Sequence, residues 1–209
     1  MYLFTIRFIR EVFKIIIIGK GIPLEKDNID TDQIIPAEYC LSTKRESFSS
    51  ALFGRWRKDE NFVLNDPAYS NSTILVAGRS FATGSSREYA VWAIKDYGFK
   101  VVIAESFGEI FYKNAIINKV LPIKMNYTDI EIIWSLLNVD NEIKIDLEKE
   151  KVFLAGREFK IQLSATSKKR YLRNIDDISL TLKDIKLIKE FEKNHLKRII
   201  NIKRGDYTE

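Results

Sequence analysis

Short runs of β-branched and aliphatic residues alternate with stretches of helical spacing through the middle of the chain. Residues 73–76 (Thr-Ile-Leu-Val) predict a buried strand. Ala90, Ile94 and Tyr97 recur three or four residues apart and predict a helix behind it, which ends near Gly98. A glycine-containing loop therefore joins the strand to the helix.

Reactive side chains gather in this loop where the helix is expected to begin. Ser85 and Glu88 have the spacing of a capping box, which predicts a helix start at Ser85 or Ser86. The first amides of the helix and the guanidinium of Arg87 would then surround two hydroxyls. Because a helix N-terminus is positive, this arrangement suits the binding of a carboxylate and the stabilisation of an oxyanion.

The same strand-and-helix pattern repeats further along the chain. Residues 100–104 predict a second strand, Ser106 and Glu109 again have the capping-box spacing, and residues 121–123 begin a third strand. Two successive strand–helix units favour an α/β fold with a parallel sheet, whose ligand chemistry lies at the carboxyl ends of the strands.

Outside this central region the pattern changes. Residues 13–18 predict a strand, and residues 19–23, which contain two glycines and a proline, predict a turn after it. Residues 143–147 and 159–163 are apolar at every second position, with a turn at residues 155–156, which is typical of antiparallel strands. The complete pattern predicts a mixed sheet.

The chain is expected to form one main domain with short ends. We predict an N-terminal extension over residues 1–12, the domain over residues 13–192 and a basic tail over residues 193–209. The last element of the domain is a predicted helix with one apolar face, formed by Leu182, Ile185, Ile188 and Phe191.

Composition supports a sizeable core and limits the classes of partner. Of the 209 residues, 45% are hydrophobic. The net charge of +5 arises from 34 basic and 29 acidic residues that are interspersed, so a small anionic substrate explains it as well as nucleic acid does. The basic tail leaves nucleic-acid binding as a distant alternative, since short charged termini are more often solvated.

Apolar runs in this sequence are too short for a membrane-spanning helix. A run such as residues 15–18 falls far short of the roughly 20 residues that a span requires. Residues 1–14 faintly resemble a targeting segment, but no small-residue cleavage site follows them. We therefore expect a cytoplasmic protein without a membrane partner.

Metal-binding side chains are scarce, with one cysteine, Cys40, and one histidine, His195. A single cysteine excludes an internal disulfide framework and a self-contained cysteine-held iron–sulfur cluster. A single histidine excludes a multi-histidine metal site and argues against a histidine-based triad. Any such metal must come from another chain.

Three acidic residues, Asp27, Asp30 and Asp32, lie within six positions of one another. One interpretation is a site for a hard cation, but the glycine and closing glutamate of an EF-hand loop are missing. The other is a tight loop whose side chains bind nearby backbone amides. We favour the tight loop.

Residues 84–88 (Gly-Ser-Ser-Arg-Glu) resemble the serine–arginine loop of the swivelling domain in the aconitase superfamily. An ordered set of flanking segments narrows this resemblance to the bacterial-type small subunits of 3-isopropylmalate dehydratase. The segments are residues 27–36, 56–57, 62–65, 96–99, 106–107, 110–111 and 176–182.

The resemblance implies a fold, a partner and a reaction. The fold is an α/β, three-layer β/β/α swivelling domain over residues 13–192, with a mixed sheet that contains parallel strand–helix units. The partner is a separate large subunit that carries a [4Fe-4S] cluster, so this chain would bind no cofactor or metal itself. The reaction exchanges 2-isopropylmalate and 3-isopropylmalate, two small dicarboxylates, through a dehydrated alkene in leucine biosynthesis.

Site residues also follow from the resemblance. Ser85 corresponds to the serine whose alkoxide removes the carbon-bound proton, and Ser86 and Arg87 correspond to positions that bind substrate carboxylate. Leu41 and Arg45 lie in the loop that influences the substrate's side chain, which implies a substrate-binding role for both. The iron of the partner's cluster would act as a Lewis acid on the departing hydroxyl.

Several positions depart from residues that are common in the family, among them Ser47, Ser49, Ile175 and Ser179 in place of glycines. Ser80, Ala82 and Tyr89 stand where asparagine, glycine and histidine are usual. Loss of a glycine that needs a positive φ would strain the backbone. Two alternatives therefore stay open: a small subunit of a related citramalate or homoaconitate-type hydro-lyase, and a catalytically impaired partner-binding subunit.

Overall fold

The computed structural model describes residues 16–41, 48–85, 87–138, 141–173, 185, 187 and 189–193. The chain divides into two compact units, residues 1–168 and residues 169–209, and each is considered by itself. The first unit contains the sheet and the candidate site. Most of the second unit, including Leu182 and Ile188 of the predicted apolar helix face, lies outside the described residues. The predicted domain boundaries therefore stay predictions.

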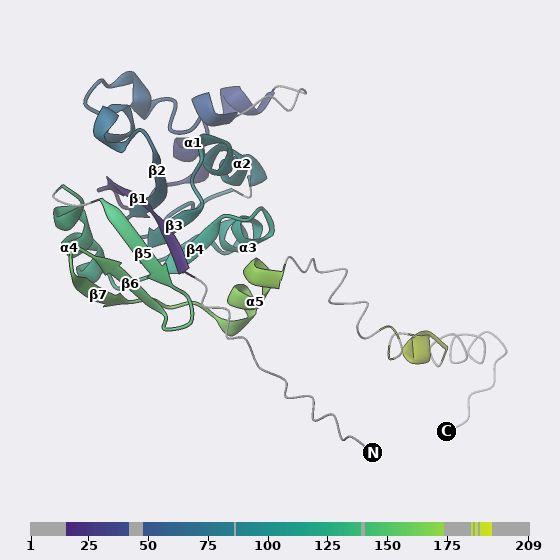
Figure 1. The fold of residues 1–209 in the computed structure, drawn as a ribbon. Helices are drawn as coiled ribbons and strands as arrows, with labels where there is room; N and C mark the ends of the chain where they lie inside the picture. Colours follow the sequence, from purple (N-terminus) through teal and green to yellow (C-terminus); the bar gives the residue numbers. More distant parts are fainter. Residues whose placement is uncertain are drawn as a thin grey trace, which may run out of the picture. The chain divides into compact units, whose positions relative to one another are not determined.

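The described strands form one mixed sheet in the order β4-β3-β2-β1-β5-β6-β7 (Figure 1). The four strands of the parallel half are β1 (Ile16–Leu24), β2 (Ser72–Ala77), β3 (Val101–Ala104) and β4 (Leu121–Lys124). The three antiparallel strands of the meander are β5 (Glu142–Asp146), β6 (Lys151–Leu154) and β7 (Arg157–Lys160). The α/β class, the mixed sheet and the predicted change to antiparallel strands are confirmed.

Three longer helices of the first unit accompany the parallel strands. They are α2 (Glu88–Tyr97), α3 (Glu109–Ile117) and α4 (Tyr127–Leu137). A four-residue helix, α1 (Thr31–Ile34), follows β1, and α5 (Ala165–Arg173) follows the meander. The connections from β1 to β2 contain short 3-10 helices: η1 (Ala37–Leu41), η2 (Phe48–Ser50), η3 (Trp56–Lys58), η4 (Val63–Asn65) and η5 (Pro67–Tyr69). No helix among the described residues is long and apolar enough to cross a membrane.

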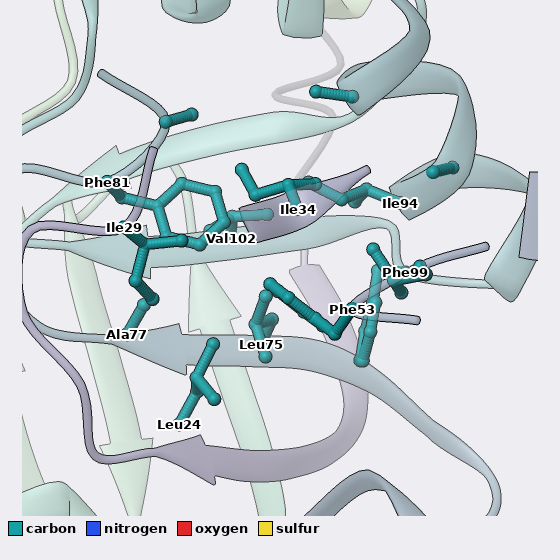
Figure 2. Close-up of a cluster of buried hydrophobic side chains, with 14 of the residues drawn as sticks. Leu24, Ile29, Ile34, Phe53, Leu75, Ala77, Phe81, Ile94, Phe99 and Val102 are labelled. Carbon is teal, nitrogen blue, oxygen red and sulfur yellow. The ribbon is translucent and has the colours of Figure 1, made fainter. Parts of the chain in front are cut away.

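Helices cover both faces of the parallel half. Leu75 and Val102 belong to a core that also contains Ile94 of α2, and Figure 2 shows this cluster with side chains from β1, β2, β3, α1 and α2. On the other face, the indole Nε1 of Trp134 on α4 donates a hydrogen bond to the Val76 carbonyl oxygen at 2.9 Å. Because both faces are buried, β2 and β3 are almost wholly apolar, as parallel strands usually are.

The predicted turn over residues 19–23 is wrong, because β1 continues through it to Leu24. Its glycines allow close packing instead. A Cβ on Gly19 would lie 2.2 Å from Thr73 Oγ1, and one on Gly21 would lie 2.6 Å from Ile143 Cδ1. Glycine inside a strand often marks such a close approach of neighbouring chain.

The ends of helices agree only in part with the sequence pattern. Gly98 ends α2 with a φ of 114°, which confirms the predicted C-cap. The predictions assigned no helix to residues 127–137, although Ile130, Ile133 and Leu137 of α4 are buried at helical spacing. The periodicity that identifies α4 was present in the sequence.

Candidate active site

The site forms where the loops after β1 and β2 run side by side. Thr31 N donates to Thr83 O at 3.0 Å, and Thr83 N donates to Ile29 O at 3.2 Å. Nearer the strands, the amide of Arg79 donates to Asp27 Oδ1 at 2.8 Å. The two loops thus form a short parallel extension of the β1–β2 pair.

A glycine permits this close approach of the two loops. A Cβ on Gly78 would lie 2.0 Å from Asp27 Oδ1 and 2.7 Å from the Lys26 carbonyl oxygen. A side chain there would therefore push the loops apart.

The acidic segment after β1 is a capped turn, as the favoured interpretation predicted. Asp30 Oδ1 accepts from Gln33 N at 2.7 Å, and Gln33 Oε1 accepts from Asp30 N at 2.8 Å, which is a complete capping box for α1. Within the part of the chain that the structure describes, no group of three His, Cys, Asp or Glu side chains is placed to hold a metal ion. These contacts account for Asp27 and Asp30 without a cation.

Two consecutive residues of α1 contact the serine–arginine loop. Thr31 Oγ1 donates to the Ser85 carbonyl oxygen at 3.0 Å and lies 3.4 Å from Ser85 Oγ. Asp32 accepts a short hydrogen bond from Arg87 Nη1, and the two form an ion pair. The sequence pattern places Asp32 in an acidic turn but gives no sign of this contact, because the two partners are 55 residues apart.

The predicted capping boxes at Ser85 and Ser106 are wrong. Helix α2 begins at Glu88 with Arg87 as its N-cap, and no side chain caps it. The Glu88 carboxylate instead accepts from Asn118 Nδ2 at 2.9 Å. Likewise, Gly108 precedes α3, while Ser106 Oγ accepts from the Ser80 amide at 2.9 Å. Contacts with distant parts of the chain use the side chains that the local pattern assigned to caps.

The later start of α2 changes the electrostatics that the sequence predicted. Ser85 lies three residues before Glu88, the first residue of α2, and helix-dipole effects fall off within the first turn. The Thr31 hydroxyl contacts Ser85, and Arg87 lines the same cavity, so these groups rather than a row of helix amides surround Ser85 among the described residues.

A cavity of about 210 Å³ opens beside Ser85 and Arg87. Its other described walls come from Thr31, Ala82, Gly84, Gly108, Glu109, Ile110, Phe111 and Asn114. Ile110, at the start of α3, is 49% exposed, which is high for so apolar a side chain. The cavity therefore combines a hydroxyl and a guanidinium with a wall from α3 that has both apolar side chains, Ile110 and Phe111, and polar ones, Glu109 and Asn114.

A larger cavity, of about 420 Å³, lies at the carboxyl end of β1. Its lining includes Glu25, Lys26, Asp59, Asp66 and Tyr69. None of the predicted site residues lines it, so size alone does not identify the site here.

Three of the predicted site residues cannot be located fully. Ser86 and Arg45 lie outside the described residues. Leu41 ends η1, and only its backbone is described. The structure therefore brings together Ser85 and Arg87, and the assignments of the other three stay predictions.

The structure shows the backbone conformation or the packing of the three residues Ser80, Ala82 and Tyr89. Ser80 and Ala82 adopt φ values of 52° and 56°, in the left-handed region where glycine is least strained. Tyr89 packs edge-on against Phe48 and Trp92, with ring centroids 5.4 and 5.0 Å away. Backbone strain is thus present at Ala82, whereas Tyr89 joins an aromatic cluster.

Cys40 is poorly suited to bind metal in the described structure. Its Sγ donates to the Pro36 carbonyl oxygen at 3.9 Å, and burial raises the pKa of its thiol. Since the thiolate is the form that binds metals, a raised pKa disfavours that role.

Comparisons with known proteins show the family to which this chain belongs. Residues 14–128 match the family model described as aconitase C-terminal domain, and this match covers more than half of the chain. The chain belongs to the aconitase C-terminal domain family. Within this family, the 3-isopropylmalate dehydratase small subunit of Salinispora tropica is 46% identical over 176 residues, which cover 83% of this chain and 90% of that protein.

Two further known proteins extend the likeness. The 3-isopropylmalate dehydratase small subunit of Corynebacterium kroppenstedtii is 44% identical over 84% of this chain and 91% of its own length. A crystal structure of 3-isopropylmalate dehydratase from Methanocaldococcus jannaschii matches with a TM-score of 0.61 and 31% identity, covering 84% of this chain and 99% of that one. The resemblance seen in the sequence is confirmed.

Proposed function

We propose that this chain is the small subunit of a cytoplasmic 3-isopropylmalate dehydratase in leucine biosynthesis. Together with a large subunit, it would exchange 2-isopropylmalate and 3-isopropylmalate by dehydration and rehydration. The observation that carries the proposal is the placement of Ser85 and Arg87 on one cavity, in a chain 46% identical to a named small subunit.

Ser85 is the proposed base, acting as its alkoxide on the carbon-bound proton. A serine hydroxyl is a very weak acid, so nearby positive charge and hydrogen-bond donors must stabilise the anion. Among the described residues, the Thr31 hydroxyl lies 3.4 Å from Ser85 Oγ, and Arg87, which lines the same cavity as Ser85, is the proposed source of positive charge.

Arg87 is the proposed carboxylate ligand, with Ser86 beside it in sequence. A guanidinium offers a planar pair of donors that matches a carboxylate. Asp32 holds one edge of Arg87, and the Arg87 side chain is still 25% exposed. A substrate carboxylate would therefore approach an arginine that is already oriented. Arg45 and Leu41 complete the proposed substrate contacts.

The cluster is assigned to the large subunit. No described group of side chains in this chain fits a metal, and the one cysteine has a raised thiol pKa. A [4Fe-4S] cluster on the partner would supply the Lewis acid for the departing hydroxyl. The exposed Ile110 at the rim of the cavity supports closure of the site by another chain.

Reconstitution with the large subunit tests the proposal. The complex is assembled anaerobically with its cluster, supplied with 2-isopropylmalate, and followed by the absorbance of the alkene. We expect turnover, and a loss of at least about 100-fold in kcat for Ser85→Ala, the lower end of what general acid–base groups contribute. Ser135→Ala, an exposed serine on α4, is the matched control and should keep full activity. Absence of turnover by the intact complex, or full turnover by Ser85→Ala, would contradict the proposal.

The same assay distinguishes two alternative functions from the proposed one. A related hydro-lyase would prefer citramalate or homoaconitate over isopropylmalate when the same complex is given a panel of substrates. An impaired partner-binding subunit is favoured by the left-handed backbone at Ala82, which costs stability near the site. Wild-type turnover in the reconstituted complex would exclude that second alternative.

A further inference from the structure

Thr31 is a buried residue at this site that, like Ser85, carries a hydroxyl. Only 3% of its surface is exposed, yet its hydroxyl is directed at the serine–arginine loop. Its Oγ1 donates to the Ser85 carbonyl oxygen at 3.0 Å and lies 3.4 Å from Ser85 Oγ. One hydroxyl thus contacts both the main chain and the side chain of the proposed base.

The main chain of Thr31 makes hydrogen bonds that fix the position of its side chain. The Thr31 amide donates to Thr83 O, and its carbonyl oxygen accepts from the Ile35 amide, both at 3.0 Å. The Asp30 capping box fixes the start of α1, and Gly84 passes close to Thr31 with a φ of 94°. A hydroxyl anchored in this way has a defined position relative to Ser85.

The Thr31 hydroxyl has two possible hydrogen-bond acceptors on Ser85, the carbonyl oxygen and Oγ. Thr31 has one proton to donate, and the Ser85 carbonyl oxygen receives it in the structure. The Ser85 hydroxyl, while protonated, can donate to Thr31 Oγ1. After Ser85 loses its proton, the Thr31 hydroxyl can rotate to donate to the alkoxide.

We propose that Thr31 is a positioning residue for Ser85, setting the conformation of the loop through the Ser85 carbonyl and offering a donor to the deprotonated Oγ. This inference rests on the proposed function of Ser85 as the base. Asp32, next in sequence, contacts Arg87, so adjacent residues of α1 each hold one member of the Ser85–Arg87 pair.

Thr31→Val and Thr31→Ser separate the hydroxyl from the shape of the side chain. Valine keeps the branched shape and removes the hydroxyl, whereas serine keeps the hydroxyl and removes a methyl group. In the reconstituted complex, we expect Thr31→Val to lower kcat about 10- to 100-fold, the effect of losing one buried hydrogen bond, with KM changed less than about threefold. Thr31→Ser should restore most of kcat.

Thr83→Val is the matched control for removal of a threonine hydroxyl nearby. Among the described residues, the Thr83 hydroxyl makes no hydrogen bond, although its backbone pairs with the loop after β1. We expect wild-type kcat for this variant. A Thr31→Val enzyme with wild-type kcat, or a Thr31→Ser enzyme as slow as Thr31→Val, would overturn the proposal.

A second readout does not depend on activity. Amide hydrogen exchange across residues 78–90 of the isolated chain should be faster in Thr31→Val than in wild type, and near wild type in Thr31→Ser. If the wild-type complex has no activity but this pattern holds, the proposed function fails while the positioning of the loop by Thr31 stands. Equal exchange in all three proteins would overturn the positioning role.

Discussion

The parallel half and the meander belong to one sheet but are constrained differently. Every residue of β3 is buried, whereas Phe159 is the only buried residue of the four in β7. Helices cover both faces of the parallel half, and the loops at its carboxyl ends carry the candidate site. The meander mixes buried residues with exposed or half-buried ones and carries none of the proposed site residues. Substitutions in the parallel half should therefore affect function and assembly, and those in the meander only stability.

Among the substitutions that compare the two halves, Ile110→Glu should have the largest effect, and it tests whether the outer edge of the parallel half meets the large subunit. Burial of an isoleucine contributes about 1.5–3 kcal/mol, so replacing it with a charge should weaken association at least about tenfold. The fold should tolerate the change, because a glutamate in the first turn suits the helix dipole.

Association of Ile110→Glu with the large subunit is measured by titration calorimetry without substrate. Ile132→Glu on α4, where the isoleucine is 38% exposed, is the matched control and should bind as wild type. Equal weakening by both variants would show that the partner does not distinguish these surfaces.

Asp32→Asn should have the next largest effect, through the orientation of Arg87. Loss of the ion pair leaves the guanidinium without its charged partner, and we expect kcat/KM to fall about tenfold in the reconstituted complex. Asp59→Asn, at an acidic residue that accepts from the Asn61 amide, serves as the control. An increase in kcat/KM for Asp32→Asn would mean that Asp32 competes with the substrate for Arg87 instead of orienting it.

Ala82→Gly should raise or preserve stability, whereas the same substitution at a buried alanine in a helix should lower it. A left-handed conformation costs an alanine about 1–2 kcal/mol, and glycine relieves this strain. The relief is partly offset by the roughly 0.5–1 kcal/mol that glycine loses in backbone entropy. Ala93 of α2 is equally buried, and Ala93→Gly should lower the free energy of unfolding by about 1 kcal/mol or more. Urea denaturation compares the two. A greater loss for Ala82→Gly than for Ala93→Gly would show that strain at residue 82 is negligible.

The smallest effect is expected in the meander. Lys151 and Glu158 form an ion pair across β6 and β7, with side chains 36% and 53% exposed. Exposed pairs contribute about 0–1 kcal/mol, so Glu158→Gln should change the free energy of unfolding by less than about 1 kcal/mol in urea and leave kcat unchanged. A loss of activity in this variant would break the functional contrast between the two halves.

Local sequence patterns predicted the strands better than the loops. The runs over residues 73–76 and 100–104, the alternation over residues 143–147 and the turn at residues 155–156 all matched elements of the sheet. These features depend on neighbours in sequence. The glycines of β1 were misinterpreted, because their close contacts with Thr73 and Ile143 come from other strands.

The candidate site was predictable through its motif but not through its contacts. Ser85 and Arg87 could be named from the sequence, and the structure brings both to one cavity. The contacts of Thr31 and Asp32 with them could not be predicted, because local periodicity carries no information about residues 54 or 55 positions apart. The same limit explains the wrong helix caps, because Ser85 and Ser106 make tertiary contacts that the local pattern does not contain.

The long sequence separation within the site has a consequence for the order of folding. Closing loops of this length costs chain entropy before any contact compensates for it, and non-local pairing is slow. The β1–β2 pair, in which Leu24 lies beside Ala77, closes a loop of nearly the same length as the Thr31–Ser85 contact, so forming this strand pair also brings α1 close to Ser85. The candidate site and the centre of the sheet should therefore form together, and activity should be lost in the same denaturant range as the β1–β2 pairing.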